Sequence, residues 1–305
     1  MASNQAILII NQGSRRTRAV YDDVIAACSR YGLMFDKIYN VRTSTDIKST
    51  VSSVKQLRPK LVVLAGGDGT VSYAASLIAG AKIEVGVIPL GTTNNFARSL
   101  NLPLDIDQAV KTIVEHPASP ISLGKINRRY FTNVAGIGMS ALVAQNVTDS
   151  QKRRWGRLAY ALVGIQQLVK HRAFHVTLTD KDSELQMHFR THQLIIANGR
   201  FHAGKEIAAD ALIDNRELVV FAIGGKGWIS FALHMMDFYL GKRKRIRDTS
   251  YLIARDIKIT TDTPQVIELD GEIARGQTPL RVQVTPGVIN IRYNKSTDEH
   301  ISTRR

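Results

Sequence analysis

Short apolar segments alternate with amphipathic ones through the first third of the chain. The apolar runs predict buried strands because they are short and rich in β-branched residues. The stretches between them carry apolar residues at helical spacing. The predicted strands are Ala6–Ile10, Phe35–Val41, Leu61–Ala65 and Glu84–Pro89, and the predicted helices are Tyr21–Tyr31, Thr45–Leu57, Val71–Ala79 and Asp107–Glu115. This alternation predicts a parallel sheet with helices on both faces.

The pattern changes after residues 116–120, where alternating apolar and polar positions begin to dominate. Two helical segments, Trp155–Lys170 and Trp228–Leu240, interrupt them. The predicted strands are Ile121–Ile126, Tyr130–Val134, Phe174–Thr179, Met187–Ala197, Leu218–Ile223, Asp256–Thr260, Gln265–Leu269, Leu280–Thr285 and Val288–Tyr293. We therefore expect an α/β domain over residues 1–118, a β-rich, sandwich-like domain over 119–295 and a polar tail over 296–305. A return of the extreme C-terminal segment to the first domain stays open.

The charge balance points to a polyanionic partner. The 305 residues include 41 Lys and Arg against 26 Asp and Glu, a formal net charge of +15. Such a protein is drawn to nucleic acid or to an anionic membrane surface. The basic residues cluster at Arg15-Arg16-Arg18, Lys152-Arg153-Arg154-Arg157 and Lys242-Arg243-Lys244-Arg245-Arg247. The last two clusters adjoin apolar helices with aromatic residues, which favours a membrane surface, and nucleic acid is not expected. Simple packing of these helices on the sandwich is the alternative.

Cysteine usage and hydropathy limit where such a protein works. Cys28 is the only cysteine, so an internal disulfide is excluded, and no apolar run of 18 residues is present. The N-terminal residues lack the basic start of a signal peptide. We therefore expect a cytoplasmic protein that associates peripherally with membranes.

Two glycine turns follow neighbouring strands at the carboxyl edge of the predicted sheet. They are Gly66-Gly67-Asp68-Gly69-Thr70 and Leu90-Gly91-Thr92-Thr93-Asn94. Glycines let backbone N–H groups approach phosphate oxygens, and a helix N-terminus adds partial positive charge. In the second turn, the threonines can donate to phosphate and Asn94 can cap the next helix. The turns predict a nucleotide site, with two tight structural turns as the alternative.

Acidic residues complicate a plain phosphate site. Asp68 would repel phosphate unless it holds a metal, orients a hydroxyl group or takes a proton. Asp270-Gly271-Glu272 follows a predicted strand of the second domain. It offers a general base or metal ligand to a cleft between the domains, or else a turn with solvated acids. The sequence lacks the GxxxxGKS/T, HExxH and GxSxG motifs.

Taken together, these segments resemble the diacylglycerol kinase catalytic-domain family, which includes sphingosine and ceramide kinases and soluble bacterial lipid kinases. The resemblance covers most of the chain. It rests on GGDGT at Gly66–Thr70, PLGTTN at Pro89–Asn94 with Phe96-Ala97 after it, FTNVAGIG at Phe131–Gly138, Gly156-Leu158-Tyr160, Asn198-Gly199 and Asp270-Gly271-Glu272.

The resemblance implies an ATP- and Mg²⁺-dependent kinase that phosphorylates a hydroxyl group of a lipid such as diacylglycerol, with ATP in the cleft between the domains. It implies that Glu272 is the general base, that Asp270 is the second choice, and that Asp68 lies beside the metal. The implied ATP-binding residues are Thr43, Gly66, Gly67, Asp68, Gly69, Thr70, Val71, Ser72, Tyr73, Gly91, Thr92 and Asn94. The expected partner is a lipid substrate at an anionic membrane surface, and a homodimer stays open.

Three positions depart from the family pattern. Asn95 and Ser122 stand where the family usually has Asp, and Asn215-Arg216-Glu217-Leu218 stands where its D-G-x-L segment binds a structural Mg²⁺. That metal position falls here on Leu212, Asn215 and Glu217. A displaced metal, no metal, or a guanidinium group in its place are all open. The alternative functions are a catalytically impaired lipid- or nucleotide-binding protein and a soluble kinase of the NAD kinase type.

Overall fold

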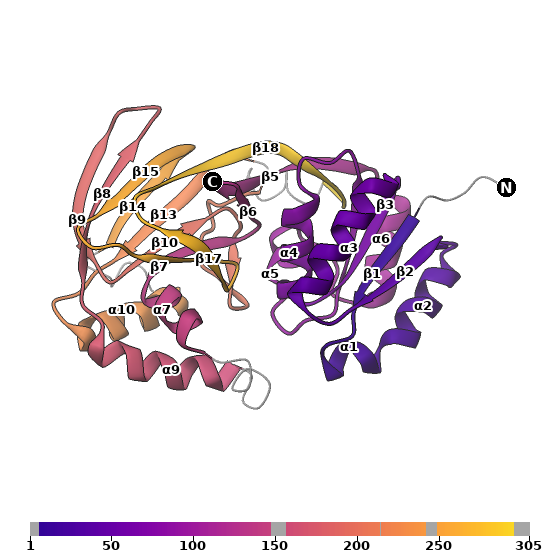
Figure 1. Ribbon diagram of the computed structural model, residues 1–305, viewed down its shortest axis with the longest axis horizontal. Coiled ribbons are helices and arrows are strands. Elements are labelled where there is room, and N and C mark those ends of the chain that lie inside the picture. The colour runs from indigo at the N-terminus through magenta and orange to yellow at the C-terminus, as the bar shows by residue number, and fades with distance from the viewer. Residues whose placement is uncertain (1–5, 148–156, 214, 242–248, 296–305) are drawn as a thin grey trace.

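The computed structural model describes residues 6–147, 157–213, 215–241 and 249–295, which form two lobes (Figure 1). The predicted polar tail and the basic clusters at 152–154 and 242–247 lie outside the described residues. The N-terminal lobe contains β1 (Ala6–Asn11), α1 (Arg15–Ala19), α2 (Tyr21–Arg30), β2 (Lys37–Val41), α3 (Ser44–Leu57), β3 (Leu61–Gly66), α4 (Asp68–Ile78), β4 (Glu84–Pro89), α5 (Asn95–Ser99) and α6 (Ile106–Glu115).

The C-terminal lobe is richer in strands. It contains β5 (Ala118–Ile126), β6 (Arg129–Phe131), β7 (Val134–Gly138), α7 (Met139–Asn146), α9 (Arg157–Lys170), β8 (Phe174–Asp180), β9 (Gln186–Thr191), β10 (Gln193–Ala197), β11 (Phe201–His202), β12 (Lys205–Glu206), β13 (Leu218–Ile223), α10 (Trp228–Tyr239), β14 (Thr249–Ala254), β15 (Asp256–Thr261), β16 (Val266–Leu269), β17 (Glu272–Gln277) and β18 (Leu280–Arg292).

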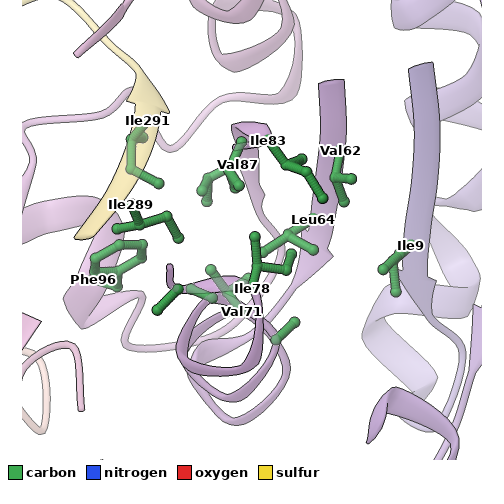
Figure 2. Packing of buried hydrophobic residues seen from close by; sticks show 14 of the residues in the cluster. Ile9, Val62, Leu64, Val71, Ile78, Ile83, Val87, Phe96, Ile289 and Ile291 are labelled. Atoms are coloured by element: carbon green, nitrogen blue, oxygen red, sulfur yellow. The ribbon is translucent and has the colours of Figure 1, made fainter. Parts of the chain in front are cut away.

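The N-terminal lobe is a parallel sheet with helices on both faces, as the sequence predicts. β1 pairs in parallel with β2 and β3, and β3 pairs in parallel with β4. Alternate residues of β1 enter different cores: Ile9 packs with α3 and α4, whereas Leu8 packs with α2 and α6. Figure 2 shows the first of these cores, in which Leu64 of β3 lies near Val71 and Ile78 of α4. Both faces of the sheet are therefore buried, which explains the continuous apolar runs.

The C-terminal lobe is a sandwich of two sheets, and this confirms the predicted fold class. One layer is the six-stranded sheet β14-β13-β10-β7-β16-β17, and the other includes β5, β15, β8 and β9. Apolar residues of both layers, such as Ile137 and Val176, share one core. The helices α7, α9 and α10 cover the outer face of the six-stranded sheet (Figure 1).

Strand β18 joins the two lobes. Its first half pairs with β15, and its last residues pair in parallel with β4, through Asn290 with Glu84 and Ile291 with Val85. Ile289 and Ile291 enter the core of the N-terminal lobe (Figure 2). The two strands predicted over 280–293 are thus one strand, whose register against β5 shifts near Gly287. One ten-stranded sheet consequently runs through both lobes and fixes their relation.

Two predicted strands are each divided in the structure. Residues 130–134 form the end of β6 and the start of β7, which lie in different sheets, because the backbone N–H groups of Thr132 and Asn133 donate to Asp270. Residues 187–197 divide at His192, whose backbone groups bond to Ile223 and Met139. No predicted element corresponds to α1, α5, α7, β11, β12, β14 or β17, each of which spans eight residues or fewer.

Candidate active site

The first glycine turn is itself the beginning of a helix. Helix α4 starts at Asp68, three residues before the predicted start, with Gly67 as the N-cap and no side-chain capping bond. The first N–H groups of a helix have no partner within the helix, so the GGDGT segment presents backbone donors and the positive end of a dipole. The side chain of Thr70 is buried, where its hydroxyl oxygen accepts a 2.5 Å hydrogen bond from the Asn11 amide. The helix end is therefore tied to the loop after β1.

Asp68 connects the two glycine turns. Its carboxylate accepts hydrogen bonds from the Thr93 hydroxyl group at 2.7 Å and from the Phe96 backbone N–H at 3.3 Å. The turns also touch directly, since a Cβ atom on Gly91 would lie 2.6 Å from Gly67 Cα. The acid inside the phosphate-like turn is thus directed toward the second turn, where it supports the start of α5.

Asn94 does not cap the next helix with its side chain, so that prediction was wrong. Its amide oxygen accepts from Gly91 N at 2.8 Å, and its amide nitrogen donates to Gly91 O at 3.0 Å. The residue is buried and lies in the left-handed region with φ +47°. The side chain closes its own turn, and Asp68 serves the helix instead. Thr92 lies exposed in this turn, whereas Thr43 caps α3 in a capping box with Asp46.

Asp270 is held by backbone donors from the start of β7. Its carboxylate accepts from the backbone N–H groups of Thr132, Asn133 and Val134 at 2.7–3.0 Å, and from the Thr132 hydroxyl group at 2.9 Å. Burial raises the pKa of Asp270, and these N–H donors oppose the rise. The Thr132 hydroxyl group also lies 2.8 Å from Ser72 of α4. Asp270 therefore fixes the acidic turn against both β7 and the N-terminal lobe.

Glu272 is the accessible acid of the turn. It is exposed at the start of β17 and lines, with Asp270, a narrow pocket between the lobes. The other lining residues are Gly69, Ser72, Tyr73, Ser76, Arg129, Tyr130 and Leu269. Since Asp270 is engaged by four donors, Glu272 is the better placed of the two to take a proton from a bound molecule.

Arg129 is a site residue that the sequence analysis missed. It extends from β6 into the same pocket, where its guanidinium group donates to the Ile273 carbonyl oxygen at 3.3 Å. Among the described residues, no carboxylate forms an ion pair with it. The pocket thus contains a cation beside Glu272. Nothing in the sequence separates Arg129 from the neighbouring Arg128, which is exposed.

Family models match both lobes of the chain. The diacylglycerol kinase catalytic domain matches residues 5–126, and the YegS C-terminal NAD kinase beta sandwich-like domain matches residues 133–293. The chain belongs to the diacylglycerol kinase catalytic-domain family. The resemblance found in the sequence is thereby confirmed, and the chain is a member of a family of lipid kinases.

Named relatives of this family member agree with that placement. A diacylglycerol kinase of Staphylococcus epidermidis is 29% identical over 215 residues, which cover 70% of this chain and 67% of the relative. The crystal structure of a diacylglycerol kinase from Bacillus anthracis covers 97% of this chain and 99% of its own, with a TM-score of 0.71 and 19% identity. A second Bacillus anthracis structure gives a TM-score of 0.77 at 23% identity. At these identities the solved structures show the fold.

The residues predicted at the family's metal positions have other partners in the structure or are buried. The amide oxygen of Asn95 accepts from Gly204 N at 2.8 Å, and Ser122 is buried. Glu217 forms a 3.5 Å ion pair with Arg255, and the Leu212 carbonyl accepts from Asn215 N. One carboxylate that already faces a guanidinium group does not fit a Mg²⁺ site, which needs several oxygen ligands. Over residues 6–147, 157–213, 215–241 and 249–295, no cluster of three His, Cys, Asp or Glu residues offers a metal site.

Proposed function

We propose that this protein transfers the γ-phosphoryl group of MgATP to a hydroxyl group of a lipid, such as diacylglycerol or a related lipid, at a membrane surface. The observation that carries the proposal is the pocket shared by Gly69 and Glu272. It opposes a helix N-terminus, which suits the phosphates of a donor, to an exposed carboxylate, which suits the hydroxyl group of an acceptor.

Each group of the pocket has a role in this reaction. The N–H groups at the start of α4 bind phosphate oxygens, and the Arg129 guanidinium group contacts the transferred phosphoryl group. The oxygen of the lipid hydroxyl group attacks the γ-phosphorus while Glu272 accepts the hydroxyl proton. The bond between the γ-phosphorus and the β–γ bridging oxygen breaks, and ADP leaves with that oxygen. Asp270 holds Glu272 in position through the bonds to β7.

Mg²⁺ enters as part of the MgATP substrate and neutralises phosphate charge there. At the start of α4, Asp68 is the carboxylate that would approach such an ion. Its two known contacts come from donors, so the carboxylate keeps lone pairs for further ligands. The predicted structural Mg²⁺ site at Leu212, Asn215 and Glu217 has no part in this mechanism, because these residues do not provide the ligands that Mg²⁺ needs.

Two other functions have specific support. The neutral Asn95 and Ser122 favour a lipid- or nucleotide-binding protein without turnover. The match of the second lobe to an NAD kinase-like sandwich favours a soluble kinase acting on NAD. Both remain alternatives to the lipid kinase.

A substrate panel tests the proposal. Radiolabelled ATP, Mg²⁺ and the full chain are incubated with mixed micelles of individual lipids, and in parallel with NAD. The proposal expects label in the organic extract for at least one hydroxyl-bearing lipid. Label on NAD alone would establish the soluble kinase, and ATP binding without labelling of any lipid would establish the binding protein.

A further inference from the structure

Helix α10 exposes an apolar stripe along one side. Ile229, Leu233, Met236 and Leu240 follow at intervals of four, three and four residues, so they lie in one row. Each is between 52% and 59% exposed. Trp228, at the start of the helix, is 44% exposed. At 1.5 Å per residue, the row extends about 16 Å along the surface.

The opposite side of the same helix is already buried. Phe231 and Phe238 are 1% exposed and pack on β13 and neighbouring strands. Packing in the core therefore explains the apolar residues on the buried side of α10, but it does not explain those on the exposed side. Helix α10 belongs to the layer that covers the outer face of the sandwich, together with α9, whose Leu162 and Ile165 are also exposed (Figure 1). Apolar surface gathered in this way marks an interaction site.

Charge identifies the partner. Lys226 is exposed just before α10, and within two residues of Leu240 the chain continues into Lys242-Arg243-Lys244-Arg245. An apolar stripe with a terminal Trp and flanking Lys and Arg is the composition of a helix that lies in the interface of an anionic bilayer. A second copy of this chain would bring like charge to this face, because each copy carries a net charge of +15.

We propose that the outer face of α10 inserts into the interfacial layer of an anionic membrane and docks the protein there. The inference deepens the proposed function and rests on it, since this is the surface at which a lipid kinase meets its acceptor. Helix α10 would lie parallel to the bilayer, with the stripe toward the acyl chains and the sandwich above it.

Vesicle sedimentation without ATP tests the docking face. The full chain is mixed with vesicles of phosphatidylglycerol and phosphatidylcholine, or of phosphatidylcholine alone. The wild type should sediment with the anionic vesicles. The double variant Leu233→Gln, Met236→Gln should lower the partition constant by roughly 10- to 100-fold, because burial of the exposed half of each side chain contributes about three- to tenfold. Glutamine keeps the helix, since its propensity is close to that of Leu and Met.

Leu57→Gln is the matched control. Leu57 is 59% exposed at the end of α3 in the other lobe, so its loss should leave the partition constant unchanged. All variants should keep the wild-type unfolding midpoint. In a Trp155→Phe background, Trp228 is the only tryptophan, and its emission should shift to the blue on anionic vesicles.

Two results would overturn the docking face. In the first, the double variant binds anionic vesicles as the wild type does. In the second, ultracentrifugation shows a dimer that the double variant dissociates while vesicle binding is unchanged, which would make the stripe an interface between copies. The kinase proposal fails separately: a protein that docks through α10 but labels no lipid would keep this inference and lose the catalytic one.

Discussion

Glu268 has a buried carboxyl group directly beneath the acidic turn. It is 3% exposed, its Oε2 accepts from Gly271 N at 2.7 Å, and the Ser140 side chain hydrogen-bonds to it. Burial raises the pKa of Glu268 to about 7; the N–H group of Gly271 opposes the rise, and the charges of Asp270 and Glu272 add to it. The folded protein therefore prefers Glu268 protonated, while the unfolded chain does not.

The sign of the pH effect follows from this difference. Below pH 4.5, the ordinary pKa of a glutamate, Glu268 is protonated in both the folded and the unfolded state, so its ionisation does not lower the free energy of unfolding. Between 4.5 and about 7, the unfolded chain releases the proton while the folded state keeps it, so the free energy of unfolding falls. Above pH 7 the loss is complete and amounts to about 3 kcal/mol, at roughly 1.4 kcal/mol per pH unit.

Glu268→Gln isolates this contribution. The amide has the shape of the protonated acid and can satisfy Gly271 and Ser140, but it does not titrate. Urea unfolding at pH 4.5 and pH 8 should show the variant gaining stability relative to the wild type by up to about 3 kcal/mol at the higher pH. Glu184→Gln, an exposed glutamate between β8 and β9, should show no such dependence. A pH-independent difference in unfolding free energy between Glu268→Gln and the wild type would mean that burial does not raise the pKa of Glu268.

Three further substitutions probe the site. Gly136→Ala should destabilise the fold by about 1–3 kcal/mol in urea unfolding, because the added Cβ would lie 2.3 Å from the Ser140 hydroxyl group. Arg129→Ala should lower kcat/KM for ATP by roughly 10- to 100-fold in steady-state assays, through loss of a charged phosphate contact, while Arg128→Ala should leave it unchanged. Asp68→Ala should cost about 1–3 kcal/mol of unfolding free energy, since two donors lose their acceptor, and Asp68→Asn should cost less.

The layered fold could be predicted because the apolar residues of each buried strand or helix face are close together in the sequence. Strands β1, β3 and β4 have both faces covered, so their residues form the apolar runs that the sequence shows. The breaks at Thr132 and His192 could not be predicted in this way. Their causes lie far along the chain. Asp270, which accepts the hydrogen bond from the Thr132 N–H group, is 138 residues from Thr132 in the sequence.

Many of the residues of the site could be predicted from the sequence, but the hydrogen bonds between them could not. Motif chemistry indicated Asp68 and the Asp270–Glu272 turn, and the structure places Glu272 and Gly69 on one pocket. That Asp68 faces Thr93, and that Asn94 closes its own turn, depends on the close packing of two glycine turns. The sequence of each turn alone does not record this packing.

The proposed docking face on α10 shows the same limit. The composition around Trp155–Lys170 predicts an interfacial segment, with simple packing on the sandwich as the alternative. In the structure α9 exposes Leu162 and Ile165, whereas α10 and its C-cap Leu240 expose a row of four apolar residues opposite two buried phenylalanines. A hydrophobic pattern identifies apolar positions, but burial on one side of a helix decides which of them remain for a partner.

Phosphoryl transfer by the Glu272→Gln variant decides whether Glu272 is the general base. Label from radiolabelled ATP is measured in lipid extracts for the wild type, for Glu272→Gln and for the exposed control Glu184→Gln, while ATP affinity is measured by calorimetry. A general base contributes about 10²- to 10⁴-fold, so we expect at least a 100-fold loss of lipid labelling for Glu272→Gln at unchanged ATP affinity. Lipid labelling by Glu272→Gln at the wild-type rate would contradict this expectation.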